Sequence, residues 1–310
     1  MTDEYGLLDT DAVEGVGDEW EDIDVTDTEA DRIARERDRE FEQFEARIKD
    51  AEHFKVEQSV FDDATFGALY KLVEDGHIEA FGGPISTGKE ANVYEAKGRD
   101  SEVAVKIFRV NASPFQQMRE YLEGDPRFEG IGNDKKQTVL AWVRKEFANL
   151  QRAREAGVRV PTPIAVERNV LVMELVGLVE DRARRLAEVS VENPETAFEV
   201  VREYMDRLHT AGLIHGDLSE YNMIIHDGEL VIIDLGQAMT VHHPNARDLL
   251  ERDCENVASF FSRQGLDVSS DDLFAFVAGD DGRLDRGLQG VAQRARSSDA
   301  SHRTGNRLNR

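Results

Sequence analysis

The stretch HGDLSEYNMIIHDGELVIID, residues 215–234, constrains the fold of this chain more than any other feature. Apolar, strand-favouring residues lie on both sides of Asp227-Gly228, and Asp-Gly is a preferred pair for the two-residue turn of a β-hairpin. Because a hairpin returns the chain to its starting point, we expect Asp234 to lie beside Asn222. A carboxylate and an amide oxygen side by side suit a magnesium ion that bridges phosphate groups.

The spacing between Asp217 and Asn222 adds a second prediction. Asp-x-x-x-x-Asn is the spacing of the protein-kinase catalytic loop, in which the aspartate accepts the proton of the substrate hydroxyl and the asparagine holds a metal ion. The Asp-Leu-Gly at 234–236 stands where kinases carry their metal-binding Asp-Phe-Gly. Each part alone is common and fits a solvated turn, but the joint pattern, with His215 ahead of it, favours a site for phosphoryl transfer.

A glycine-containing loop near residue 88 allows two interpretations. Gly83, Gly88 and Lys89 fit the Gly-x-x-x-x-Gly-Lys of a phosphate-binding P-loop. That motif continues with Ser or Thr and opens a helix, whereas here Glu90 follows and residues 92–96 favour a strand. The P-loop interpretation is therefore rejected in favour of a strand-turn-strand.

Such a strand-turn-strand would cover the phosphates of a nucleotide with its backbone amides. Ser86, Thr87 and Lys89 would face the phosphates, and Gly88 would let the backbone approach them closely. The loop has one glycine where a kinase glycine-rich loop has three, and a plain hairpin explains the pattern equally well.

Lys106 lies inside an apolar strand predicted over 102–110, where an unpaired cation would be costly. It matches the Val-Ala-x-Lys lysine of kinases, which contacts the α and β phosphates; a lysine reaching water from an edge strand is the alternative. A partner carboxylate is expected on the helix predicted over 138–156. We choose Glu146 for this ion pair, with Glu155 as the alternative.

The strand before residue 175 leads into Met-Glu-Leu-Val-Gly, which is predicted to be the hinge between two lobes. The backbone at Glu174 and Val176 would contact adenine, and Met173 would lie at the back of the pocket. A buried strand followed by an ordinary loop is the alternative.

Two further segments carry weaker predictions. Residues 111–136 contain two prolines and three glycines and are expected to form a long functional loop. Ser113 in it is a candidate for self-phosphorylation, with an ordinary surface serine as the alternative. The adjacent His242 and His243 cannot easily face one metal ion and are expected at the surface.

Length and composition bound the class of protein. The 310 residues suffice for one large two-lobed domain, and no apolar run approaches the roughly 20 residues that span a bilayer, so no membrane partner is expected. The acidic N-terminus is unlike a signal peptide. The only cysteine, Cys254, excludes an internal disulfide and a zinc site of several cysteines, which suits a reducing cytoplasm.

The net charge of −25 is unevenly distributed. Residues 1–28 carry eleven Asp and Glu and no Lys or Arg, which predicts a disordered acidic tail. A charged helix is expected over 29–54, and an Arg-rich disordered tail over 281–310. The acidity and the excess of Arg over Lys are typical of adaptation to high salt, with an ordinary acidic cytosolic protein as the alternative.

With these residues assembled, the chain resembles the RIO family of atypical protein kinases, in its first subfamily. The resemblance is carried by Ser-Thr-Gly-Lys-Glu-Ala at 86–91, His-Gly-Asp-Leu-Ser-Glu-Tyr-Asn at 215–222 and Ile-Asp-Leu-Gly-Gln at 233–237. It covers about residues 55–280 and, with the acidic composition, indicates a haloarchaeal member. It implies an α+β, trimmed two-lobed protein-kinase-like fold. The N-lobe, about 55–173, would hold an antiparallel sheet and a helix like αC, and the C-lobe, about 178–280, would be mainly helical.

The resemblance also implies the chemistry. It implies binding of ATP with Mg²⁺ or Mn²⁺, serine autophosphorylation and a role in maturation of the small ribosomal subunit precursor, with rRNA and ribosomal proteins as partners and no DNA. The catalytic aspartate maps to Asp217, the metal ligands to Asn222 and Asp234, and the ATP lysine to Lys106. In the ATPase cycle of the family, Asp234 would become phosphorylated. Gly216 replaces the Arg of ordinary kinases, so control by a phosphorylated activation loop is not expected.

Two rivals remain at this point. A small-molecule kinase of the aminoglycoside phosphotransferase kind also uses a His-Gly-Asp-x-x-x-x-Asn loop, although the Ser-Thr-Gly-Lys-Glu-Ala loop argues against it. A ribosome-assembly protein whose nucleotide site only controls docking would need no catalysis by Asp217.

Overall fold

The computed structural model describes residues 61–110, 115–123, 125–128, 134–177 and 183–279. The predicted acidic tail, the predicted helix over 29–54, the Arg-rich tail and Ser113 lie outside the described residues. No helix in the described ranges is both long and apolar enough to cross a membrane.

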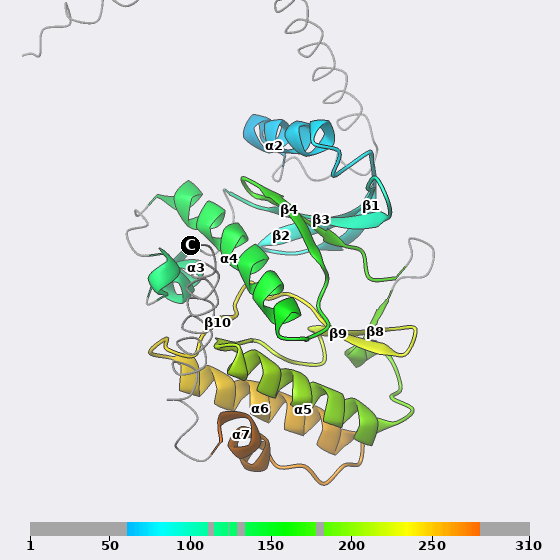
Figure 1. The fold of residues 1–310 in the computed structure, drawn as a ribbon, viewed down its shortest axis with the longest axis vertical. Helices are drawn as coiled ribbons and strands as arrows, with labels where there is room; N and C mark the ends of the chain where they lie inside the picture. Colours follow the sequence, from blue (N-terminus) through cyan, green and yellow to red (C-terminus); the bar gives the residue numbers. More distant parts are fainter. Residues whose placement is uncertain (1–60, 111–114, 124, 129–133, 178–182, 280–310) are drawn as a thin grey trace, which may run out of the picture. The chain divides into compact units, whose positions relative to one another are not determined.

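A five-stranded antiparallel sheet forms the N-terminal part of the described structure (Figure 1). Its strands lie in the order β1-β2-β3-β5-β4. They are β1 (Ala80–Thr87), β2 (Ala91–Lys97), β3 (Glu102–Phe108), β4 (Pro163–Glu167) and β5 (Val170–Glu174). Strand β3 lies in the centre of the sheet. Its successive side chains point to opposite faces, and both faces are buried because apolar residues occur on each of them. Lys106 is therefore an interior residue of the sheet rather than an edge lysine.

Helix α2 (Asp63–Glu74) packs against β4 and β5 through Phe66, Leu69 and Leu72. The side chain of Asp62 caps its N-terminus by accepting the Thr65 amide at 2.8 Å.

Helix α4 (Lys135–Glu155) is the helix predicted over 138–156, and it starts earlier because Asp134 caps its N-terminus. The preceding segment, which was predicted to be a long functional loop, is partly helical. It contains helix α3 (Phe115–Leu122) and the 3₁₀ turn η3 (Pro126–Phe128). Met118 and Leu122 of α3 are buried in the main core, and this apolar spacing of one helical turn explains why a helix forms there.

The C-terminal part is mainly helical, as predicted, with α5, α6 and α7 lying together (Figure 1). Its elements are β6 (Arg184–Arg185), η4 (Leu186–Glu188), α5 (Pro194–Thr210), β7 (Leu213–Ile214), β8 (Met223–His226), β9 (Glu229–Ile232), β10 (Met239–Thr240), α6 (Ala246–Arg263) and α7 (Ser270–Ala278). The predicted hairpin is β8–β9, and both turn residues, Asp227 and Gly228, have the positive φ that a type I′ turn requires.

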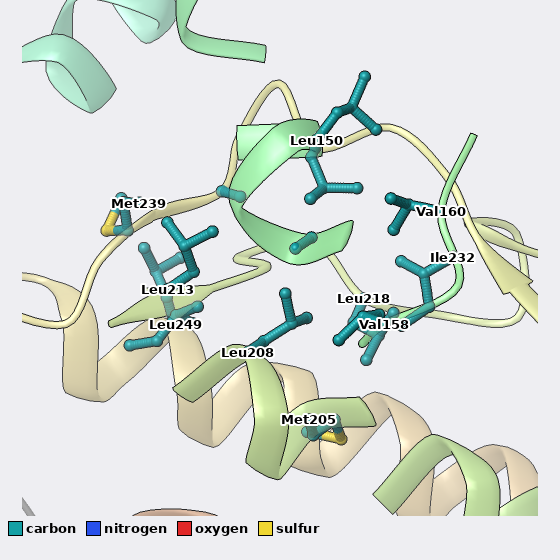
Figure 2. Packing of buried hydrophobic residues seen from close by; sticks show 14 of the residues in the cluster. Leu150, Val158, Val160, Met205, Leu208, Leu213, Leu218, Ile232, Met239 and Leu249 are labelled. Carbon is teal, nitrogen blue, oxygen red and sulfur yellow. The ribbon is translucent and has the colours of Figure 1, made fainter. Parts of the chain in front are cut away.

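One apolar cluster joins α4 to the C-terminal helices. Leu150 of α4, Leu208 of α5 and Leu249 of α6 belong to it, together with Leu213 and Met239 from β7 and β10 (Figure 2). Because α4 contributes residues to this cluster along its length and also packs against β4 and β5, it connects the sheet to the C-terminal helices.

The prediction for one of the two adjacent histidines is wrong. His242 is exposed, but His243 is buried, its Nε2 lying 2.7 Å from the carbonyl oxygen of Glu123 while its Nδ1 accepts the Asn245 amide. His243 thus ties the end of α3 to the start of α6. Nothing local in the sequence indicates this partner, because Glu123 is distant along the chain.

Candidate active site

The catalytic-loop segment folds back on the end of the β8–β9 hairpin. The Ile233 amide donates to the Asn222 carbonyl oxygen at 3.0 Å, and the ring Nε2 of His215 lies 3.1 Å from the Ile233 carbonyl oxygen. Burial lowers the pKa of His215, which keeps the ring neutral. These contacts bring Asp234 beside Asn222, as the hairpin prediction requires.

Asp217 and Asn222 are in direct contact. The Asn222 amide nitrogen donates to the Asp217 carbonyl oxygen at 2.7 Å and to its carboxylate at 3.1 Å. Both hydrogen bonds use the amide nitrogen of Asn222, so the amide oxygen of Asn222 points away from Asp217. Asp234 has φ of 63°, and its side chain is 53% exposed. This left-handed backbone is costly for a non-glycine residue and is frequent at functional sites.

The oxygens of Asn222 and Asp234 are the hard donors that Mg²⁺ prefers. Among the described residues no group of three or more His, Cys, Asp or Glu side chains is arranged to hold a metal ion. An ion at this place would therefore complete its shell with phosphate oxygens and water, which is how Mg²⁺ is usually bound beside a nucleotide. The residues present fit such an ion.

Lys106 joins the sheet to this cluster. Its Nζ donates to Glu146 at 2.7 and 3.0 Å and to Asp234 Oδ1 at 3.0 Å. Although burial opposes the charge, the carboxylates of Asp234 and Glu146 raise the pKa of Lys106, so it stays an ammonium. In return, the Lys106 charge lowers the pKa of Asp234. Three residues predicted from separate parts of the sequence thus meet within hydrogen-bonding distance.

Glu146 is deeply buried, since only 1% of it is exposed. It lies under Gly236, where an added Cβ would stand 3.1 Å from both the Glu146 carboxylate and the Trp142 ring nitrogen. Glycine at 236 therefore lets the backbone after Asp234 approach α4 closely. Glu155, the alternative partner for Lys106, is exposed at the last residue of α4.

Residues 86–89 comprise the end of β1 and the beginning of the turn into β2, so no helix follows them. Thr87, Gly88 and Lys89 are exposed and Ser86 is half-buried. The Gly88 amide donates to the Ala91 carbonyl oxygen at 3.0 Å, and a Cβ on Gly88 would come within 2.9 Å of that oxygen. Glycine is thus required by the turn itself.

Glu90 reaches the cluster, although sequence reasoning assigned it no role. Burial raises its pKa, and the carboxylates of Asp234 and Asp217 raise the pKa further, while Lys106 opposes them. Glu90 is therefore within electrostatic reach of all three residues.

At the hinge, Met173 and Val176 are half-buried. Glu174 is engaged: its amide donates to the Thr162 carbonyl oxygen, and its carboxylate accepts from Arg159 at 2.5 and 3.0 Å. Because Arg159 also pairs with Glu229 of the C-terminal hairpin at 3.3 Å, Glu174 braces the hinge instead of offering its amide to a ligand.

Asp253 of α6 supports the catalytic loop and was missed by sequence reasoning. Its carboxylate accepts the Gly216 amide at 2.7 Å and the Leu218 amide at 2.8 Å, so it holds both neighbours of Asp217. Asp253 is 1% exposed and lies among the apolar residues of the buried face of α6. A charged residue at a position of the apolar stripe of a helix is the sequence signal that could have indicated this role.

We expect Asp253→Ala to lower the free energy of unfolding by about 3 kcal/mol, because two buried amides lose charge-assisted hydrogen bonds. Denaturant unfolding monitored by circular dichroism measures this change. Asp248→Ala, which removes an exposed carboxylate from the first turn of the same helix, is the control and should change the stability by well under about 1 kcal/mol. Equal stabilities for the two variants would contradict the assigned role of Asp253.

Comparison with known proteins agrees with this geometry. Residues 92–273 match the model of the RIO domain. The chain is 73% identical over 283 residues to the RIO-type serine/threonine-protein kinase Rio1 of Haloferax volcanii, covering 91% of this chain and 98% of that protein. It is 36% identical to the Rio1 kinase of Methanocaldococcus jannaschii, covering 85% and 91% of the two chains.

Among solved structures, the Rio2 kinase of Chaetomium thermophilum in an ADP/Mg²⁺-phosphoaspartate complex is similar, with a TM-score of 0.54 and 26% identity. The similarity covers 78% of this chain and 75% of that chain. It agrees with the α+β kinase-like fold described above. The chain therefore belongs to the RIO family of serine/threonine protein kinases, in the Rio1 type that the Haloferax volcanii relative represents.

Proposed function

We propose that this protein binds ATP with Mg²⁺ between the sheet and the catalytic loop and transfers the γ-phosphoryl group to a serine hydroxyl or to water. The observation that carries the proposal is the contact of one lysine, Lys106, with both Glu146 and Asp234. It joins a phosphate-binding cation from the sheet to a metal-binding carboxylate from the hairpin. Mn²⁺ could replace Mg²⁺ because both accept the same oxygen ligands.

Each predicted residue has a role in this proposal. Lys106, oriented by Glu146, binds the α and β phosphates, and Asn222 and Asp234 hold the metal ion, which neutralises phosphate charge. Asp217 orients the attacking hydroxyl and accepts its proton. Phosphoryl transfer requires mainly positioning and charge neutralisation, so these few groups suffice.

The remaining nucleotide contacts come from the loop and the hinge. Ser86, Thr87, Gly88 and Lys89 cover the phosphates, an assignment supported by the exposure of the turn. At the hinge, Met173 lines the adenine pocket. Because the Glu174 amide is already engaged with Thr162, the donor to the base is Val176.

Asp234 is also proposed to accept the phosphoryl group. Its carboxylate oxygen would attack the γ-phosphorus, the bond to the bridging oxygen of ADP would break, and water would later hydrolyse the acyl phosphate to inorganic phosphate. The phosphoaspartate of the Rio2 kinase complex from Chaetomium thermophilum supports this assignment.

We further propose that the kinase domain occupies about residues 55–280, and that the protein acts in the cytoplasm on the precursor of the small ribosomal subunit. The span of the RIO domain match, 92–273, lies inside these bounds. The Rio1 relatives support the assignment to this family of kinases, and the family resemblance implies the ribosomal partner.

The test is incubation of the full chain with γ-labelled ATP and Mg²⁺, comparing the wild type with Asp234→Ala. We expect label on the wild-type protein and release of labelled phosphate, and a loss of both in the variant. Hydroxylamine should remove label from an acyl phosphate but not from phosphoserine. A wild type that binds ATP yet yields neither product would favour an interaction protein, and labelled aminoglycoside from a mixed panel would favour a small-molecule kinase.

A further inference from the structure

The backbone that follows Asp234 is held by side chains rather than by regular secondary structure. Lys145 Nζ donates to the carbonyl oxygens of Gly236 at 2.7 Å and Ala238 at 2.5 Å. One helical turn further along α4, the Asn149 amide donates to the carbonyl oxygens of Leu235 at 3.0 Å and Ala238 at 2.8 Å. Two side chains therefore satisfy the carbonyls of three residues in this short segment.

Placing a lysine at position 145 has a high desolvation cost. Lys145 is fully buried, and within the described part of the chain no carboxylate lies at ion-pair distance from it. Burial lowers the pKa of Lys145 to about 7; Arg127 acts in the same direction, while Asp125 and Glu146 oppose both. Its partners are the two carbonyls and the faces of the Trp142 and Tyr121 rings, 4.9 and 6.0 Å from Nζ. An apolar side chain would pack there without this desolvation cost.

The segment before α4 supports the same contacts. The Tyr121 hydroxyl on α3 lies 2.9 Å from Gln237 Oε1. Arg127 of η3, which is paired with Asp125, donates to Asn149 Oδ1 at 3.0 Å, and this contact leaves the Asn149 nitrogen directed at the carbonyls. The part of the chain predicted to be a long functional loop thus contacts the segment after Asp234 through Tyr121 and supports Asn149 through Arg127.

We propose that Lys145, Asn149 and Tyr121 form a brace that fixes residues 235–238 and thereby sets the carboxylate of Asp234 for the metal ion, with Lys145 as the main positioning residue. Lys145 is adjacent to Glu146, so consecutive residues of α4 position the metal-binding aspartate and the phosphate-binding lysine. Asp234 has a left-handed, strained backbone conformation, which persists only where the surrounding structure holds it. The brace supplies that support. The brace rests on the proposed role of Asp234 as a metal ligand.

The test measures how strongly Mg²⁺ tightens the binding of a fluorescent ADP analogue to the full chain. The measured quantity is the dissociation constant without Mg²⁺ divided by that with Mg²⁺. We expect Lys145→Met to reduce this ratio by about 10-fold or more, as loss of a group that orients a metal ligand does. Without Mg²⁺, the dissociation constant should stay within about 3-fold of the wild-type value, because the Lys145 ammonium is directed at backbone carbonyls and is not one of the proposed nucleotide contacts. Lys136→Met, which changes an exposed lysine of the same helix, is the matched control and should keep the wild-type ratio.

If a thermal melt shows that Lys145→Met is not folded, two milder variants test the same proposal. Asn149→Ser removes the donor to Leu235 and Ala238, and Tyr121→Phe removes only the hydroxyl. We expect about a 3-fold reduction of the ratio in Tyr121→Phe and a larger one in Asn149→Ser. Folded variants that all keep the wild-type ratio would overturn the brace. Asp234→Ala separates the two claims: if it keeps the Mg²⁺ effect, the proposed metal site fails, whereas if it loses the effect and the brace variants do not, the brace alone fails.

Discussion

Asp217→Asn should lower the rate of phosphoryl transfer by about 10²–10⁴-fold, the range typical for loss of a general base. The amide keeps the size of the side chain and a hydrogen bond to Asn222, so the loop geometry of the wild type should survive. What is lost is the negative charge that orients the hydroxyl and accepts its proton. The measurement is the single-turnover rate with Mg²⁺ and with enzyme in saturating excess over γ-labelled ATP, which reports the chemical step rather than product release.

A matched exchange elsewhere in the same segment controls for the change in net charge. Asp227→Asn also removes one carboxylate, at the exposed turn of the hairpin, and asparagine tolerates the positive φ found there. We expect its rate to equal that of the wild type. If Asp217→Asn instead kept wild-type ATP turnover but lost transfer to serine, the protein would act as an ATPase with the attack led by Asp234. Retention of both activities would remove Asp217 from the mechanism.

The parts of the site that sequence reasoning reached are those whose geometry is local or chemically forced. Asp234 returns to Asn222 because an Asp-Gly turn connects two short strands. Lys106 and Glu146 are 40 positions apart, yet their pairing was predicted because a lysine inside an apolar strand needs a carboxylate.

The parts that it missed are held by backbone groups of distant segments. Lys145 and Asp253 bind carbonyls and amides of the loops around residues 236 and 217, and every residue carries those groups, so no pattern of residue types reveals such partners. The sequence does show a charged residue on an apolar helical face, as at Asp253, which indicates that a buried partner exists but not which one. The helix α3 was missed because its flanking prolines and glycines dominated the interpretation of residues 111–136.

Lys106→Met is the second variant for which we expect a large effect. The buried ammonium is in contact with Asp234, and with ATP bound it would neutralise phosphate charge. Loss of one such preorganised donor typically costs about 10²–10³-fold in rate. The same single-turnover assay measures it, with Lys136→Met, which changes an exposed lysine of α4, as the control.

Glu146 should act only through Lys106, and a double-mutant cycle tests this. Glu146→Gln leaves the buried ammonium with one carboxylate partner, so we expect a loss of about 10-fold or more, in line with the cost of removing one partner of a buried ion pair. In the Lys106→Met background the same exchange should have almost no further effect on the rate, because the group that Glu146 orients is gone. Additive losses would instead mean that Glu146 acts on Gly236 and the segment after Asp234 directly. In that case α4 would set the metal site through both Glu146 and Lys145, and the lysine in the sheet would be a separate contributor.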